Sequence, residues 1–131
     1  MSDLYWVYGG VNTNWSTAGN WRVGSSGGAV SAAAPTLSDN VFFDSAATGT
    51  VTVTTSSVCN NITITSASLT LAGSGTWSIY GSLSWPATGL TRTYTGAVTF
   101  AATSSGKTIN TNGNTLTTST ATFNGVGGSW A

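Results

Sequence analysis

Short runs in which apolar residues alternate with Thr or Ser recur along the chain from Thr50 onward, and they constrain the fold more than any other feature. Alternation with a period of two indicates β-strands that bury one face, and the Gly, Asn and Ser residues between the runs are typical of turns. No segment has the apolar spacing of an amphipathic helix, so we expect almost no helix. The predicted strands are residues 41–43, 51–53, 62–64, 69–71, 77–79, 83–85, 93–95, 98–100, 108–110, 116–118, 122–123 and 129–130.

The runs also repeat. Every third strand contains one of the residues Val53, Ile79, Phe100 and Phe123, which are separated by steps of 26, 21 and 23 residues. Two further series have similar steps, so we predict a loose repeat of about 23 residues with three strands in each repeat. In a β-helix, three such strands wind around the axis and each pairs with its counterpart in the next coil, because one coil cannot bury its own apolar face.

The predicted fold is therefore all-β, a short right-handed parallel β-helix of about three coils with an aromatic N-terminal cap. Residues 1–48 are expected to form the N-terminal cap segment, and residues 49–131 the β-helix coils of the same structural domain. A β-sandwich or jelly roll remains the alternative. It is less favoured because strong two-residue hairpin signals are missing between the runs, apart from Asn112-Gly113.

The composition limits the chemistry that the chain can perform. Only 5% of the residues are charged, the formal net charge is zero, and the chain has no His and no Glu. His-based triads and paired-Glu glycosidase sites are impossible, and a zinc site lacks its ligands. Three basic residues are too few for a nucleic-acid surface, and no apolar run approaches the length of a membrane span. We expect no enzyme activity, no catalytic residue, no metal and no cofactor.

Three local patterns have a chemical and a structural interpretation. Residues 101–108 fit a loose P-loop pattern, but the motif needs a following helix, and a strand is predicted there. Asp39 and Asp44 flank a predicted strand and could hold calcium or stabilise turns. Arg92 and Lys107 could serve as a base in a polysaccharide lyase, but residues 49–131 contain no acid to assist. We favour the structural interpretation of all three.

The aromatic residues are the main candidates for contacts with other molecules. Trp6, Trp15 and Trp21 are expected to cap the first coil, which would otherwise expose an apolar cross-section, and the alternative is a platform on which sugar rings stack. Tyr80 and Tyr94 are expected to make surface contacts. The full set of interface or glycan-stacking candidates is Trp6, Trp15, Trp21, Tyr80, Tyr94 and Trp130.

One pattern extends along the chain: Asn14-Trp15-Ser16, Asn20-Trp21, the segment 39–43 and the segment 61–64. In these residues the chain resembles the N-terminal region of bacterial and phage surface proteins that continue as parallel β-helices. They include phage virion and tail-associated proteins and autotransporter-like adhesins. The resemblance implies a parallel β-helix and a place on the surface of a particle or a cell.

We therefore expect a non-enzymatic virion structural protein, a phage capsid decoration (cement) or tail-associated protein that acts through β-rich interfaces. Its expected partners are copies of itself, in a homo-oligomer such as a trimer, and another virion protein such as the major capsid protein. The start of the chain, MSDLYWVYGG, lacks a secretory signal, so we expect synthesis in the host cytoplasm and a final location in the virion. The alternative is a carbohydrate-binding or adhesin module that uses surface Trp and Tyr to bind a glycan.

Overall fold

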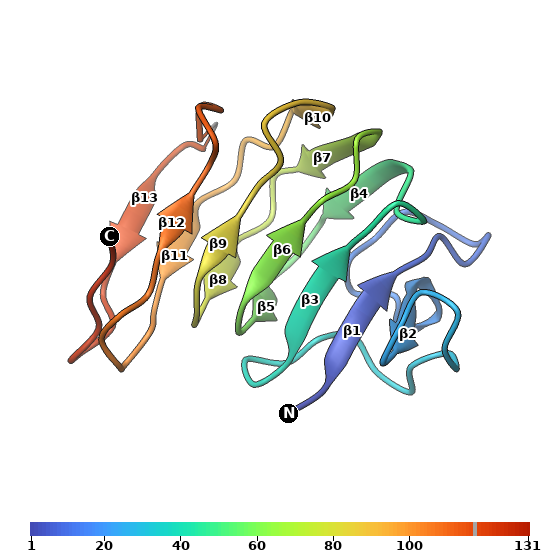
Figure 1. The fold of residues 1–131 in the computed structure, drawn as a ribbon, viewed down its shortest axis with the longest axis horizontal. Helices are drawn as coiled ribbons and strands as arrows, with labels where there is room; N and C mark the ends of the chain where they lie inside the picture. The colour runs from blue at the N-terminus through green and yellow to red at the C-terminus, as the bar shows by residue number, and fades with distance from the viewer. Residues whose placement is uncertain (117) are drawn as a thin grey trace.

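The strands stack into a parallel β-solenoid in the computed structural model, which describes residues 1–116 and 118–131 (Figure 1). A three-residue 3-10 helix at Ala18–Asn20 is the one helix in this described part, so the expectation of an all-β chain is confirmed. The strands are β1 (Asp3–Trp6), β2 (Trp21–Val23), β3 (Asn40–Phe43), β4 (Gly49–Val53), β5 (Ser57–Cys59), β6 (Ile62–Ile64), β7 (Leu69–Gly73), β8 (Trp77–Ile79), β9 (Leu83–Ser84), β10 (Leu90–Arg92), β11 (Val98–Phe100), β12 (Ile109–Asn110) and β13 (Ala121–Phe123).

Three sheets form the sides of the solenoid. Face A has the order β12-β9-β6-β3-β1-β2, face B the order β10-β7-β4, and face C the order β13-β11-β8-β5. Each coil contributes one strand to each face, so β3 to β5, β6 to β8 and β9 to β11 are complete coils, and β12 and β13 belong to a fourth turn. The first coil begins at β3, inside the segment 1–48. In Figure 1 the near strands run upward, the chain crosses to the far side at the top, and the coils advance from right to left, which is a right-handed path.

The coils are in regular register through the first three turns. Paired residues are 20 positions apart between β5 and β8 and 21 apart between β8 and β11, as in Ser57↔Trp77 and Trp77↔Val98. In the fourth turn the step lengthens to 23 from Val98 to Ala121 and to 26 from Leu83 to Ile109. The repeat is therefore shorter than the predicted 23 residues in the well-packed part of the solenoid, and reaches or exceeds that length near its end.

Inward side chains of successive coils stack directly on one another and form the core. Ile79 lies in register between Cys59 of the coil before and Phe100 of the coil after, and all three are fully buried. The Thr or Ser between two inward residues faces outward, as the buried–intermediate–buried pattern of β6, β8 and β11 shows. This alternation is the feature that made the strands visible in the sequence.

Polar side chains also stack, at the corner that precedes each face A strand. The Asn40 Oδ1 accepts hydrogen bonds from the side-chain amides of Asn60 at 3.0 Å and Asn61 at 3.1 Å. One coil on, the Asn61 Oδ1 accepts from the Ser82 amide at 2.7 Å, and the Ser82 Oγ accepts from the Thr108 amide at 3.0 Å. This corner ladder satisfies backbone groups that the turns leave without a strand partner.

Two glycines permit close approach of neighbouring coils. Gly73 ends β7 with a φ of 103°, and a Cβ there would clash with the backbone of Val53 in the coil before. Gly89 has a φ of 86°, and a Cβ there would clash with the backbone of Ala67. Glycine alone adopts this left-handed region readily, so both turns depend on it.

Some predicted strands differ from the structure. Val53 was aligned with Ile79, but the partner of Ile79 is Cys59 in β5, and Val53 pairs with Gly73. The sequence does not predict the strand β5, because its inward residues are Ser57 and Cys59 rather than large apolar ones. The strand predicted at 93–95 is wrong, because β10 ends at Arg92.

Two predicted strands lie at the end of the solenoid. The strand predicted at 116–118 includes residue 117, which lies outside the described residues. The one predicted at 129–130 is a single parallel bridge between Trp130 and Lys107. Across residues 1–116 and 118–131, no helix has the length and hydropathy that crossing a lipid bilayer requires.

Shortening an inward side chain in the middle coil should destabilise the fold much more than shortening its outward neighbour. Ile79→Ala removes a side chain with no exposed surface and is expected to lower the free energy of unfolding by about 2–5 kcal/mol. Ser78→Ala, one residue away on the outer face, is expected to change it by less than about 0.5 kcal/mol. Chemical denaturation measures both values, and equal effects would contradict the stacking of Ile79 in the core.

Candidate functional site

The N-terminal end of the solenoid is closed by three tryptophans. Trp6, Trp15 and Trp21 are almost completely buried and surround Phe43, the last residue of β3. The ring centroids of Trp15 and Trp21 are 5.0 Å apart, and those of Trp6 and Trp21 are 5.2 Å apart, both in edge-to-face geometry. The Trp21 Nε1 also donates a hydrogen bond to the Trp15 carbonyl at 2.8 Å. The predicted aromatic cap is present.

A buried asparagine holds the cap loops together. The Asn20 Nδ2 donates to the carbonyls of Asn12 at 2.9 Å and Asn14 at 3.1 Å, and its Oδ1 accepts from the Gly9 amide at 2.8 Å. Asn20 has no exposed surface. Asn20 was not predicted from the sequence, because its three backbone partners in the cap loops come together only in the folded chain.

The cap also closes the edge of face A. The strand β1 pairs in parallel with β3, and β2 then pairs with β1 in the antiparallel direction, from Leu4↔Val23 to Trp6↔Trp21. The outer side of β2 carries a further bridge between Arg22 and Val30. The antiparallel pairing of β2 with β1 therefore ends the parallel stack of face A at this end of the molecule (Figure 1).

Burial removes four of the six aromatic candidates from the surface. Trp6, Trp15, Trp21 and Tyr94 are at most 2% exposed, so they offer no face to a sugar or a partner, contrary to the glycan-stacking and surface-contact interpretations. The Tyr94 hydroxyl lies between the carbonyls of Gly75 and Ala97, and burial raises the pKa of Tyr94 to about 12. Tyr94 is thus a corner residue of the core.

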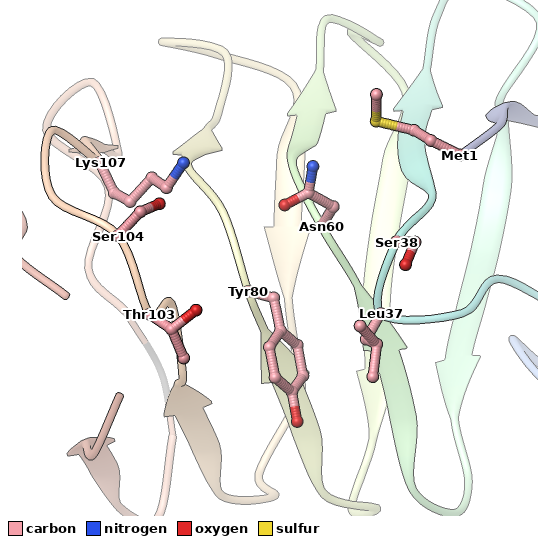
Figure 2. Close-up of a pocket in the computed structure, with 8 residues that line it drawn as sticks. All are labelled: Met1, Leu37, Ser38, Asn60, Tyr80, Thr103, Ser104 and Lys107. Carbon is pink, nitrogen blue, oxygen red and sulfur yellow. The ribbon is translucent and has the colours of Figure 1, made fainter. Parts of the chain in front are cut away.

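The other two candidates remain partly accessible, at different places. Tyr80 lies in the turn between β8 and β9 and lines a groove on the corner of faces C and A (Figure 2). Trp130 lies at the C-terminal end, where its ring contacts Phe123 edge to face at a centroid distance of 5.3 Å. The structure does not bring Tyr80 and Trp130 into one site.

The C-terminal end of the solenoid is open. All three residues of β13 are exposed, whereas the paired residues Val98 and Phe100 of β11 are fully buried. Phe123 stacks on Phe100 with a centroid distance of 4.8 Å and is still 56% exposed, and Val126 is 89% exposed. We call Ile109, Phe123, Val126 and Trp130 the open end, because they continue the core into solvent.

The few ionisable side chains serve the turns. Asp39 accepts hydrogen bonds from the amides of Ser2 and Thr36 and from the Thr36 hydroxyl, at 2.8–2.9 Å. Partial burial of Asp39 favours its neutral form, but these hydrogen bonds outweigh that effect and hold its pKa below the ordinary value. Asp44 accepts from the Ala46 amide at 2.9 Å in a similar turn. The turn interpretation of both carboxylates agrees with these contacts.

The remaining reactive groups lie apart. Arg92 donates to the Asn114 Oδ1 at 2.7 Å and to the Leu90 carbonyl at 3.1 Å, and the first of these bonds is a contact between coils. Cys59 is fully buried in the core, and desolvation raises the pKa of its thiol well above the ordinary range. No group of three or more His, Cys, Asp or Glu side chains that suits a metal ion occurs among the described residues. Residues 104–108, in the loose P-loop pattern, precede the strand β12 and not a helix.

Comparison with known proteins adds no relative. No family model, no curated protein and no solved structure matches the chain. The function must therefore be argued from the geometry of the two ends and of the surface between them.

Removing the Asn20 side chain should loosen the cap. Asn20→Ala leaves the Gly9 amide and two buried carbonyls without partners, so we expect the free energy of unfolding to fall by about 1–3 kcal/mol. The matched control is Asn124→Ala at an exposed position near the other end, with an expected change below about 0.5 kcal/mol. Thermal or denaturant unfolding measures both variants. If Asn20→Ala were as stable as the control, the organising role of Asn20 would be refuted.

Proposed function

We propose that this protein is a non-enzymatic structural component of a virion, a phage capsid decoration or tail-associated protein that assembles through its open end. The observation that carries the proposal is the difference between the two ends of the solenoid. One end is sealed by three buried tryptophans and an antiparallel strand, while the other exposes Phe123 and Val126. A solenoid that is capped at one end only presents a ready surface for further β-structure.

The backbone supports association at the same place. The strand β13 is the last strand of face C and pairs only with β11 among the described strands, so its outer edge is available for pairing. On face A, the segment that contains Trp130 lies beside β12 and pairs there through a single parallel bridge to Lys107. An added strand would receive main-chain hydrogen bonds from these edges and cover the apolar side chains between them.

Low charge makes the surface easy to bury. Residues 45–131 contain only two ionised side chains, Arg92 and Lys107, and Arg92 is held by Asn114 and a backbone carbonyl. The open end itself, Ile109, Phe123, Val126 and Trp130, consists of aliphatic and aromatic side chains. Burying it therefore desolvates little charge, and about 25 cal/mol per Å² of apolar area is gained before the costs of association.

The sealed cap determines how copies can meet. On face A, β2 with its bridge to Val30 occupies the N-terminal edge, whereas β5 of face C pairs only with β8 among the described strands. Because the cap buries its aromatic side chains and the open end exposes Phe123 and Val126, two copies bury most apolar area when they meet open end to open end, which is a closed two-fold contact. A virion protein with an edge of its own, such as the major capsid protein, would occupy the same surface in an assembled particle. This geometry favours a dimer over the trimer expected from the sequence.

The isolated chain should associate through the open end. Light scattering after size exclusion is expected to give twice the 13.2 kDa mass of the chain, and Val126→Asp should return it to a folded monomer. Val126 is 89% exposed, so its replacement disturbs no core contact. Val11→Asp at the capped end, where Val11 is 80% exposed, is the matched control and should leave the mass unchanged. A concentration-independent monomer, or an equal effect of Val11→Asp, would overturn assembly through the open end.

The virion location has its own test. Particles purified by density gradient from cells that make the protein should contain it in many copies, measured by quantitative mass spectrometry against the major capsid protein. Particles from cells that make the Val126→Asp variant should contain much less of it, because the docking surface is lost. Absence of the wild-type chain from purified particles would refute the virion proposal and leave the self-association result unaffected.

A further inference from the structure

An open groove runs along the corner between faces C and A, with a volume of about 390 Å³ (Figure 2). Its lining comes from successive turns of the solenoid. Leu37 and Ser38 precede β3, Asn60 follows β5, Tyr80 follows β8, and Ser104 and Lys107 lie between β11 and β12. Four turns that are far apart in the sequence therefore contribute side chains to one surface.

The stacking of the coils gives the groove its length. Neighbouring strands in a sheet lie about 4.8 Å apart, so a groove that crosses four layers extends over roughly 14 Å. The corner ladder fixes the spacing of these layers, because the side-chain amide of Asn60 donates a hydrogen bond to the Asn40 Oδ1. The groove is thus long, straight and supported by ordered backbone, and it suits an extended oligomer better than a single small ring.

The lining combines one aromatic ring and short polar side chains with the apolar side chains of Met1 and Leu37. Figure 2 shows the Tyr80 ring in the middle of the groove, with Ser104 and Lys107 on one side and Asn60 and Ser38 on the other. Tyr80 is only partly buried, whereas the hydroxyl of the comparable residue Tyr94 is held by two core carbonyls. An aromatic ring flanked by hydroxyl and amide groups matches a ligand that has apolar C–H faces and many hydroxyl groups, which is the chemistry of a saccharide.

Among the described residues that line the groove, Lys107 alone has a charged side chain. Lys107 carries its ammonium group over the groove in Figure 2. The carboxylate next to Ser38 belongs to Asp39 at the opposite end, where three hydrogen bonds within its turn and from Ser2 occupy it. A ligand carboxylate or sulfate would therefore meet its partner at Lys107.

From this arrangement we infer that the groove binds an acidic oligosaccharide, with a sugar ring against Tyr80 and an acidic group at Lys107. The inference does not depend on assembly through the open end, which uses other residues. It also differs from the sugar platform considered for Trp6, Trp15 and Trp21, since those rings are buried in the cap. An acidic peptide would share only the contact with Lys107.

Chemical-shift mapping of the ¹⁵N-labelled full chain tests the site, with three probes. The probes are an oligogalacturonate, a neutral maltooligosaccharide of equal length, and poly-aspartate. Oligogalacturonate is expected to shift the amides of Asn60, Tyr80 and Ser104 and to bind at least about tenfold more tightly than the neutral sugar. Shifts confined to other surfaces, or no shifts with either sugar, would overturn the inference.

Matched variants separate the two contacts. Tyr80→Ala should weaken oligogalacturonate binding by about tenfold, whereas Tyr8→Ala, at a tyrosine that is 52% exposed on the cap, should not change it. Lys107→Gln should remove the preference for the acidic sugar and keep weak binding of the neutral one. If poly-aspartate binds as tightly as oligogalacturonate and Tyr80→Ala has no effect, the site is a simple electrostatic contact and the saccharide inference is wrong.

Discussion

The packing of one coil on the next is the interaction on which the whole structure depends. A single coil has three strands of two to five residues and cannot bury its inward side chains by itself. In register, each inward residue has a neighbour above and below, as Ile79 has in Cys59 and Phe100. Three features keep successive coils in this contact. They are the spacing of 20 or 21 residues between paired positions, the corner ladder, and the close backbone approach that Gly73 and Gly89 permit.

The same interaction explains why the two ends differ. No other coil packs against the N-terminal side of the first coil in the described residues. The cap segment, which has a different composition, covers its apolar cross-section with Trp6, Trp15 and Trp21. The fourth turn has no comparable cover in the described residues, and its apolar side chains are less buried than those of the third coil. Thus Ile109 is partly buried, while Phe123 and Val126 are exposed. The proposed assembly gives this turn the neighbour that every other coil has.

Much of the fold could be predicted from the sequence, because an inward apolar residue next to an outward Thr leaves a visible pattern. The prediction failed where that pattern is weak. The inward residues of β5 are small, so its alternation is hard to detect. Thr93 and Thr95 alternate with Tyr94, but this segment lies at a corner after the end of β10. The strands β1 and β2 pair in the cap, whose sequence follows no repeat. The sequence pattern does not separate the partly exposed Tyr80 from the buried Tyr94, because each tyrosine lies near a Gly and a Ser or Thr. The groove could not be predicted from the sequence, because its lining residues come together only when the coils stack.

The regular spacing of the coils also has a consequence for how the chain folds. Each parallel pairing from β3 to β11 joins residues only 20 or 21 positions apart, so every coil closes a loop of nearly the same length at a similar entropic cost. The cap, with most of the aromatic contacts, precedes the coils in the chain and leaves the ribosome before them. It can therefore act as a nucleus onto which the coils add one after another during synthesis. At every stage of such growth the last coil is unfinished, and the exposed Phe123 and Val126 give the fourth turn the same state in the described structure.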